Sequence, residues 1–145
     1  MVVSVAVSVA LAVGRKERLR FAVEKLSELG CSHFWPLDSE YMQFPGNLGS
    51  QVKKLQATAV AALKQSRRPY MTEVELPLTL TALLKTCVER KLEPVFCQPC
   101  GPESVSLDSW AAGVHSKEEF VLVVGPEGGF SEREADAIAE AGHQG

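Results

Sequence analysis

The first thirteen residues alternate large and small side chains. Large apolar residues occupy the odd positions from Val3 to Val13, and serine or alanine occupies the even positions between them. A period of two is typical of a β-strand, and the lack of charge predicts burial on both faces. A signal peptide is the competing interpretation, but no positively charged segment precedes the apolar run. The run is also too short to cross a membrane, so no membrane partner is expected.

Helical and strand-like segments then alternate along the chain. Apolar residues recur at intervals of three and four in segments that predict helices near 19–29, 52–63 and 79–90. Gly30 is expected to cap the end of the first helix, and Thr79 the start of the third. Short apolar runs predict strands at 31–37, 94–98 and 119–124.

The last predicted helix begins with a recognisable capping signal. Ser131 and Glu134 match the S-x-x-E capping box, and the helix is expected to run through Ile138 to Ala141. Because strands and helices alternate, the predicted class is α/β, with a mainly parallel sheet flanked by helices. The 145 residues suit one domain, 1–145. The alternation calls for another strand after the final residues, so either the sheet is complete without it or the chain stops short of its natural end.

Charge is unevenly distributed, although the formal net charge is only −3. The segment 41–72 contains five basic residues and no acidic residue: Lys53, Lys54, Lys64, Arg67 and Arg68. The segment 118–145 contains seven acidic residues, with Arg133 as its one basic residue. Such asymmetry can mark a surface for an anionic partner, and the alternative is an ordinary solvated helix face.

Cys97 and Cys100 form a C-x-x-C pair. A zinc site needs two more ligands at a compatible spacing, and no second pair follows, so no bound metal is expected. A redox pair is an alternative, and incidental thiols are favoured over both. Nothing in the cysteine pattern demands an oxidising compartment, so the cytoplasm is the default location.

Gly125-Pro-Glu-Gly-Gly129 follows the apolar run 119–124 and precedes the last helix. In open α/β sheets ligands bind beyond the carboxyl ends of strands, and glycine lets a backbone approach a ligand closely. The spacing matches neither the dinucleotide-binding fingerprint nor the P-loop. Glu127 would also repel a pyrophosphate. The loop therefore suits a ligand that carries positive charge and no phosphate, and a tight strand-to-helix turn is the equal alternative.

The stretch VLVVGPEGGFSEREADAI resembles the signature of the RsmE family, the 16S ribosomal RNA uridine-N3 methyltransferases of the knotted SPOUT class. Lys25-Leu-Ser-Glu-Leu-Gly30, followed by Pro36-Leu37, is similar to the family's K-x-x-E-L-G segment. Gln65-Ser66 with Arg68 is similar to its E-Q-S-x-R stretch. The matches occur in the family's order over most of residues 15–142.

The resemblance implies S-adenosylmethionine as the cofactor and a uridine N3 of small-subunit ribosomal RNA as the substrate. It implies a homodimer. The cofactor-binding residues that it implies are Gly125, Pro126, Glu127, Gly128, Gly129 and, on an adjacent wall near Cys97, Gln98. Lys53, Lys54, Arg67 and Arg68 become candidate contacts for RNA phosphates.

The sequence also departs from the family pattern. No segment corresponds to the family's N-terminal RNA-binding domain of the PUA type, and the chain stops before the Gly- and Arg-containing segment that closes the knot. That segment contains the expected catalytic arginine, so the catalytic residue here is unknown. The expected fold is therefore an incomplete SPOUT-type domain. The alternative function is a non-catalytic α/β domain that retains only binding or dimerisation.

Overall fold

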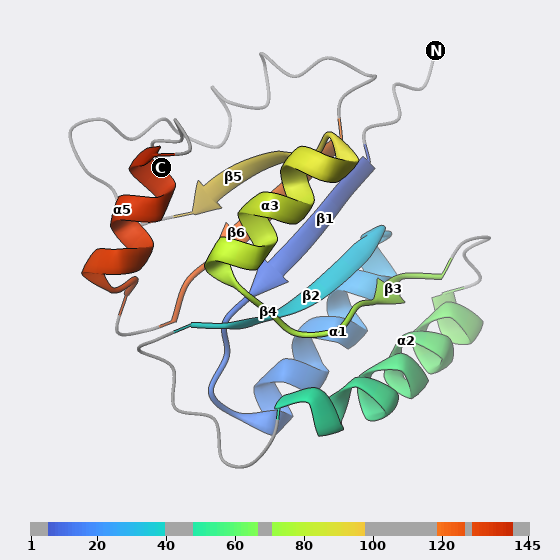
Figure 1. Cartoon of the computed structure of the whole chain (residues 1–145). Helices are drawn as coiled ribbons and strands as arrows, with labels where there is room; N and C mark the ends of the chain where they lie inside the picture. The colour runs from blue at the N-terminus through green and yellow to red at the C-terminus, as the bar shows by residue number, and fades with distance from the viewer. Residues whose placement is uncertain (1–5, 40–47, 67–70, 98–118, 127–128, 141–145) are drawn as a thin grey trace.

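The computed structural model describes residues 6–39, 48–66, 71–97, 119–126 and 129–140 (Figure 1). The strands are β1 (Ala6–Leu11), β2 (His33–Asp38), β3 (Glu73–Val74), β4 (Leu78–Thr79), β5 (Glu93–Cys97) and β6 (Glu119–Val124). The helices are α1 (Lys16–Leu29), the 3-10 turn η1 (Leu48–Gln51), α2 (Val52–Ser66), α3 (Leu80–Arg90) and α5 (Glu132–Glu140).

The strands form one sheet in the order β3-β2-β1-β6-β5, and β4 pairs with the far end of β2. Every pairing between described strands is parallel. Strands β1 and β6 lie at the centre, paired from Ala6–Glu119 to Leu11–Val124. The predicted α/β class with a mainly parallel sheet is therefore confirmed.

Helices cover both faces of the sheet (Figure 1). Helices α1 and α2 pack on one face, in a core that includes Val9, Val23 and Leu55, and α3 and α5 pack on the other, in a core that includes Ala10 and Leu83. The alternation along β1 explains this arrangement. Its large residues fill the core under α1 and α2, whereas its alanines let the sheet approach the second core, which contains the bulky side chain of Trp35.

Capping residues explain where two of the helices start or end. Gly30 has a φ of 91° and its N–H caps α1, which only glycine does without strain. Thr79 accepts a hydrogen bond from the Ala82 N–H at 3.3 Å and caps α3. Both predictions are confirmed. Helix α1 begins at Lys16, earlier than the apolar spacing predicts, because its exposed first turn contributes no apolar signal.

The edge strand differs from the prediction. The sequence predicts one short extended piece at 73–76, between the second and third helices, but two short strands, β3 and β4, pair with the two ends of β2. The apolar run 31–37 predicts a core position for His33. His33 begins β2 beside the edge strand β3, with its side chain 32% exposed, so this prediction is wrong. No helix in the described part of the chain is both long enough and apolar enough to cross a lipid bilayer.

Candidate functional site

The glycine-rich loop connects β6 to α5 at the carboxyl edge of the sheet. Strand β1, its neighbour, leads into α1 on one face, whereas β6 leads into α5 on the opposite face (Figure 1). Two adjacent parallel strands whose connections diverge in this way open a crevice between them, and ligands of open α/β sheets bind in such crevices. The loop therefore lies where this architecture places a ligand.

A larger residue is disfavoured at each of the two described glycines of the loop, for a different steric reason. A Cβ on Gly125 would lie 2.9 to 3.2 Å from the ring atoms of Phe130, closer than packed atoms allow. Gly129 has a φ of 81°, and its N–H donates to the Pro126 carbonyl at 2.9 Å, which closes a tight turn. A Cβ there would meet none of the described residues within 4 Å, so in the described part of the chain this side of the backbone is uncovered.

Phe130 ties the loop to the sheet. Its ring meets that of Phe96 on β5 edge to face, with the ring centroids 6.4 Å apart. Phe96 is 5% exposed and belongs to the core under α3 and α5. Cys97, next along β5, pairs with Val124 at the end of β6, so the end of β5 lies beside the start of the loop. The predicted role of this strand end as an adjacent wall of the cofactor site stays a prediction.

The capping box at the start of α5 is formed. The Ser131 N–H donates to Glu134 Oε1 at 3.0 Å, and the Glu134 N–H donates to Ser131 Oγ at 3.1 Å. Glu134 is only 6% exposed. Ser39, directly after β2, donates its hydroxyl to the same carboxylate, at 2.9 and 3.0 Å from its two oxygens. Sequence reasoning missed Ser39. The one signal available was a small polar residue directly after a buried strand.

The structure brings together Gly125, Pro126 and Gly129 of the predicted cofactor residues. Gln98, Glu127 and Gly128 lie outside the described residues, so their roles stay predictions. Lys53 and Lys54 are exposed in the first turn of α2, and Arg67 and Arg68 lie outside the described residues.

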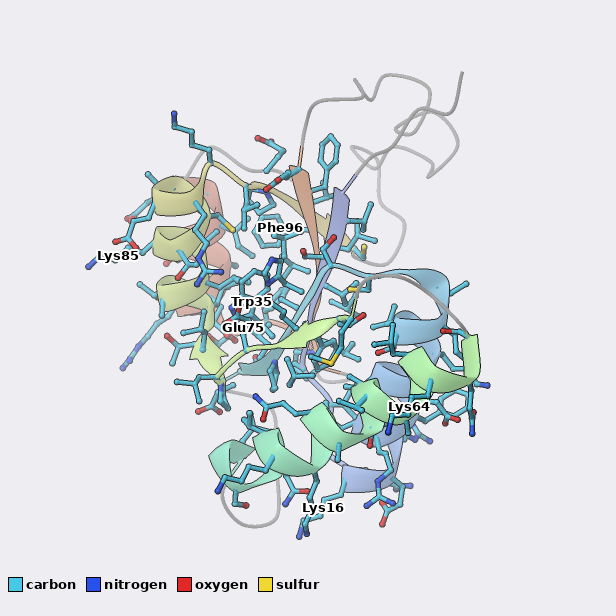
Figure 2. The ribbon with its side chains drawn as sticks, turned by 90° about the vertical axis from the view of Figure 1, so that its right-hand side faces the viewer. Lys16, Trp35, Lys64, Glu75, Lys85 and Phe96 are labelled. Atoms are coloured by element: carbon cyan, nitrogen blue, oxygen red, sulfur yellow. The ribbon has the colours of Figure 1, made fainter. Side chains whose placement is uncertain are left out.

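Additional basic residues lie near Lys53 and Lys54. Arg15 and Lys16 are exposed at the start of α1, and the two helices pack side by side. Figure 1 places the starts of both helices at the same end of the molecule, and Figure 2 shows Lys16 at that end. The predicted basic segment was 41–72 alone. The exposed basic residues at the start of α1 are additional candidates for phosphate contact.

The three cysteine thiols in the described part of the chain have raised pKa values. Burial raises the pKa of Cys31 to about 11, and burial with the nearby Glu93 carboxylate raises that of Cys87 to about 11. Burial also raises the pKa of Cys97, although this residue is exposed. A redox C-x-x-C motif needs a lowered thiol pKa, so a redox role for Cys97 has no support. Cys100 lies outside the described residues.

We expect iodoacetamide to modify Cys97 before Cys31 and Cys87 in the reduced native protein. At pH 7.5 a thiol of pKa about 11 is thiolate in roughly three molecules per ten thousand, and burial also blocks access. Peptide mapping by mass spectrometry over a time course measures the order. Labelling of Cys31 or Cys87 as fast as Cys97 before unfolding would contradict the structure.

A second cluster of polar side chains lies at the opposite, amino edge of the sheet. His33 Nδ1 lies 3.0 Å from Glu75 Oε1 and 3.5 Å from Glu73 Oε2, and Arg90 lies 3.4 Å from Glu75 Oε1. The rings of His33 and Trp35 stack with their centroids 5.5 Å apart. The His33, Glu73 and Glu75 side chains could hold a metal ion by proximity alone. Because Arg90 already pairs with Glu75, we interpret the cluster as an ion-pair network. The absence of a metal stays a prediction.

The model of the RNA methyltransferase domain family matches residues 3–145. The chain belongs to this family. Ribosomal RNA small subunit methyltransferase E of Aquifex aeolicus is 32% identical over 121 residues, which cover 83% of this chain and 49% of that protein. The protein of the same name from Mesomycoplasma hyopneumoniae is 24% identical over 143 residues, or 95% of this chain and 59% of that protein. The resemblance to the RsmE family is confirmed.

The fold of this RNA methyltransferase domain also occurs in solved structures. The small-subunit methyltransferase E of Neisseria gonorrhoeae, solved bound to S-adenosylmethionine, superposes with a TM-score of 0.79 at 22% identity. The match covers 97% of this chain and 56% of that one. The chain shares the fold of these SPOUT-type methyltransferases and spans about half the length of the curated relatives and solved structures that it matches.

Proposed function

We propose that this chain is a single methyltransferase domain that binds S-adenosylmethionine at the loop between β6 and α5. Its substrate is a uridine N3 in 16S ribosomal RNA, and it works as a homodimer. The observation that carries the proposal is a glycine-rich loop at the carboxyl ends of the adjacent strands β1 and β6, in a chain of the RNA methyltransferase domain family. The names of the small-subunit methyltransferases E and the cofactor bound to one of them support the substrate and the ligand.

The described loop residues fit this cofactor. The open side of Gly129 leaves room for a ligand against the backbone, so hydrogen bonds can form without an intervening side chain. Gly125, Pro126 and Gly129 carry no charge, and α5, which follows, is rich in acidic residues at its start. A cofactor with a sulfonium and no phosphate suits such a place better than a nucleotide does.

The role of the protein in the reaction is to hold and orient the reactants. When bound, S-adenosylmethionine would supply the methyl group for a deprotonated N3 and would leave as S-adenosylhomocysteine. Phe130, packed against Phe96, fixes the loop on the sheet, and the Ala12 N–H, which donates to the Val124 carbonyl at 3.0 Å, fixes its other end. Such positioning accounts for much of the catalysis in two-substrate reactions. The residue that removes the N3 proton stays unassigned.

Isothermal titration calorimetry of the 145-residue chain with S-adenosylmethionine tests the proposal. We expect saturable binding of one molecule per chain and competition by S-adenosylhomocysteine, the product. Size-exclusion chromatography with light scattering on the same sample tests the homodimer. The absence of heat and of competition would favour the alternative, a non-catalytic α/β domain. Transfer of labelled methyl to a 16S ribosomal RNA transcript tests the reaction itself.

A further inference from the structure

Glu134 carries more hydrogen bonds than its helix requires. A capping box needs one N-cap side chain and one acidic residue, which Ser131 and Glu134 supply. Ser39 adds a further donor from a position 95 residues away in the sequence. Ser39 is 3% exposed and Glu134 is 6% exposed. In the described part of the chain no cation pairs with Glu134. Its carboxylate therefore depends on these donors, because an unsatisfied buried carboxylate is strongly disfavoured.

The contact also joins elements on either side of the crevice. Ser39 follows β2, and Glu134 belongs to the helix that follows β6. Strand β1 lies between β2 and β6 in the sheet. The hydrogen bonds thus connect the two strand ends that flank β1, at the edge where the loop lies (Figure 1). Neither partner is needed by the other for its own secondary structure.

We propose that Ser39 and Glu134 form a positioning pair for the loop between β6 and α5. The loop is held at one end by the pairing of β6 with β1 and at the other by Ser131, whose N–H is fixed on the Glu134 carboxylate. Ser39 fixes that carboxylate in turn. The pair holds residues 129–131, the described end of the loop, in place at the start of α5, which lowers the entropy lost when a ligand binds there. As a statement about S-adenosylmethionine, the inference rests on the function proposed above.

Amide hydrogen exchange of the ligand-free protein tests the pair directly. In Ser39→Ala we expect amides of residues 129–135 to exchange at least about tenfold faster than in the wild type. Ser39→Thr keeps the hydroxyl and should restore slow exchange. Ser39→Cys, the second variant, keeps a side chain of similar shape, but its thiol is a weak hydrogen-bond donor. Its exchange rates at 129–135 should therefore match those of Ser39→Ala. Unchanged exchange at 129–135 in both Ser39→Ala and Ser39→Cys overturns the proposal.

Thr79→Ala is the matched control. It removes a hydroxyl that caps α3, at the same edge of the sheet, without touching the loop. We expect its melting temperature to fall through the loss of the cap, with wild-type exchange at 129–135. Accelerated exchange there in Thr79→Ala would show that general destabilisation, and not the pair, sets the loop dynamics.

Calorimetry separates this inference from the proposed function. We expect the Kd for S-adenosylmethionine to rise at least about fivefold in Ser39→Ala and to stay unchanged in Thr79→Ala. A Kd that rises equally in both variants overturns the positioning role. If the wild-type chain itself does not bind, the proposed function fails, and the exchange data still decide whether the pair holds the loop.

Discussion

Gly125→Ala should raise the Kd for S-adenosylmethionine at least about tenfold and destabilise the protein by about 1–3 kcal/mol. The added methyl would lie 2.9 to 3.2 Å from the Phe130 ring. The ring already packs edge to face against Phe96. Moving the ring away from the new methyl group therefore disturbs the contact that holds the loop on the sheet. Calorimetry with the cofactor and thermal unfolding measure the two effects.

A double-mutant cycle with Phe130→Leu identifies the cause. A leucine side chain at residue 130 is shorter and leaves room for the new methyl group. If the clash is responsible, Gly125→Ala combined with Phe130→Leu should bind and unfold like Phe130→Leu alone. Additive losses would show that Gly125 matters for another reason, such as direct contact of its backbone with the ligand. Wild-type affinity in Gly125→Ala would remove this loop from the proposed site.

The features that the sequence predicts correctly are those set by neighbouring residues. The alternation of Val9 with Ala10 assigns the two faces of β1, and the S-x-x-E spacing places the start of α5. Both patterns span only a few neighbouring positions. The local conformational preference of the chain therefore agrees with the packing of the folded protein. The GPEGG motif is equally local, and its position after a strand at the carboxyl edge follows from the alternation of strands and helices.

The features that the sequence does not predict depend on distant residues. Ser39 gains its role from Glu134, and no local pattern marks a partner so far along the chain. His33 lies on an apolar run, which suggests a core position. Its side chain is 32% exposed because His33 begins β2 beside Glu73 of the edge strand β3. The basic start of α1 becomes part of a larger surface only because α1 and α2 pack together. In each case the arrangement of strands and helices decides which residues become neighbours. The periodicity of the sequence does not encode that arrangement.

The basic surface at the starts of α1 and α2 is the second place where a large effect is expected. Lys53→Glu combined with Lys54→Glu should weaken binding to a 16S ribosomal RNA transcript roughly 100-fold. The slope of the logarithm of RNA affinity against the logarithm of salt concentration should decrease in magnitude by about one for each phosphate contact that is lost. Filter binding or fluorescence anisotropy at several salt concentrations measures both quantities.

Stability discriminates a phosphate site from an ordinary solvated face. Lys53 and Lys54 are exposed near the amino end of α2, where the helix dipole disfavours cations. The two glutamates should therefore leave the melting temperature unchanged or raise it slightly, while RNA affinity falls. Lys85→Glu is the matched control for Lys54→Glu, since Lys85 is exposed on α3, on the far side of the sheet from Lys64 of α2 (Figure 2). Equal loss of RNA affinity in these two single variants would mean that net charge alone governs binding. A loss confined to Lys54→Glu would place the phosphate contacts on the face that α1 and α2 share.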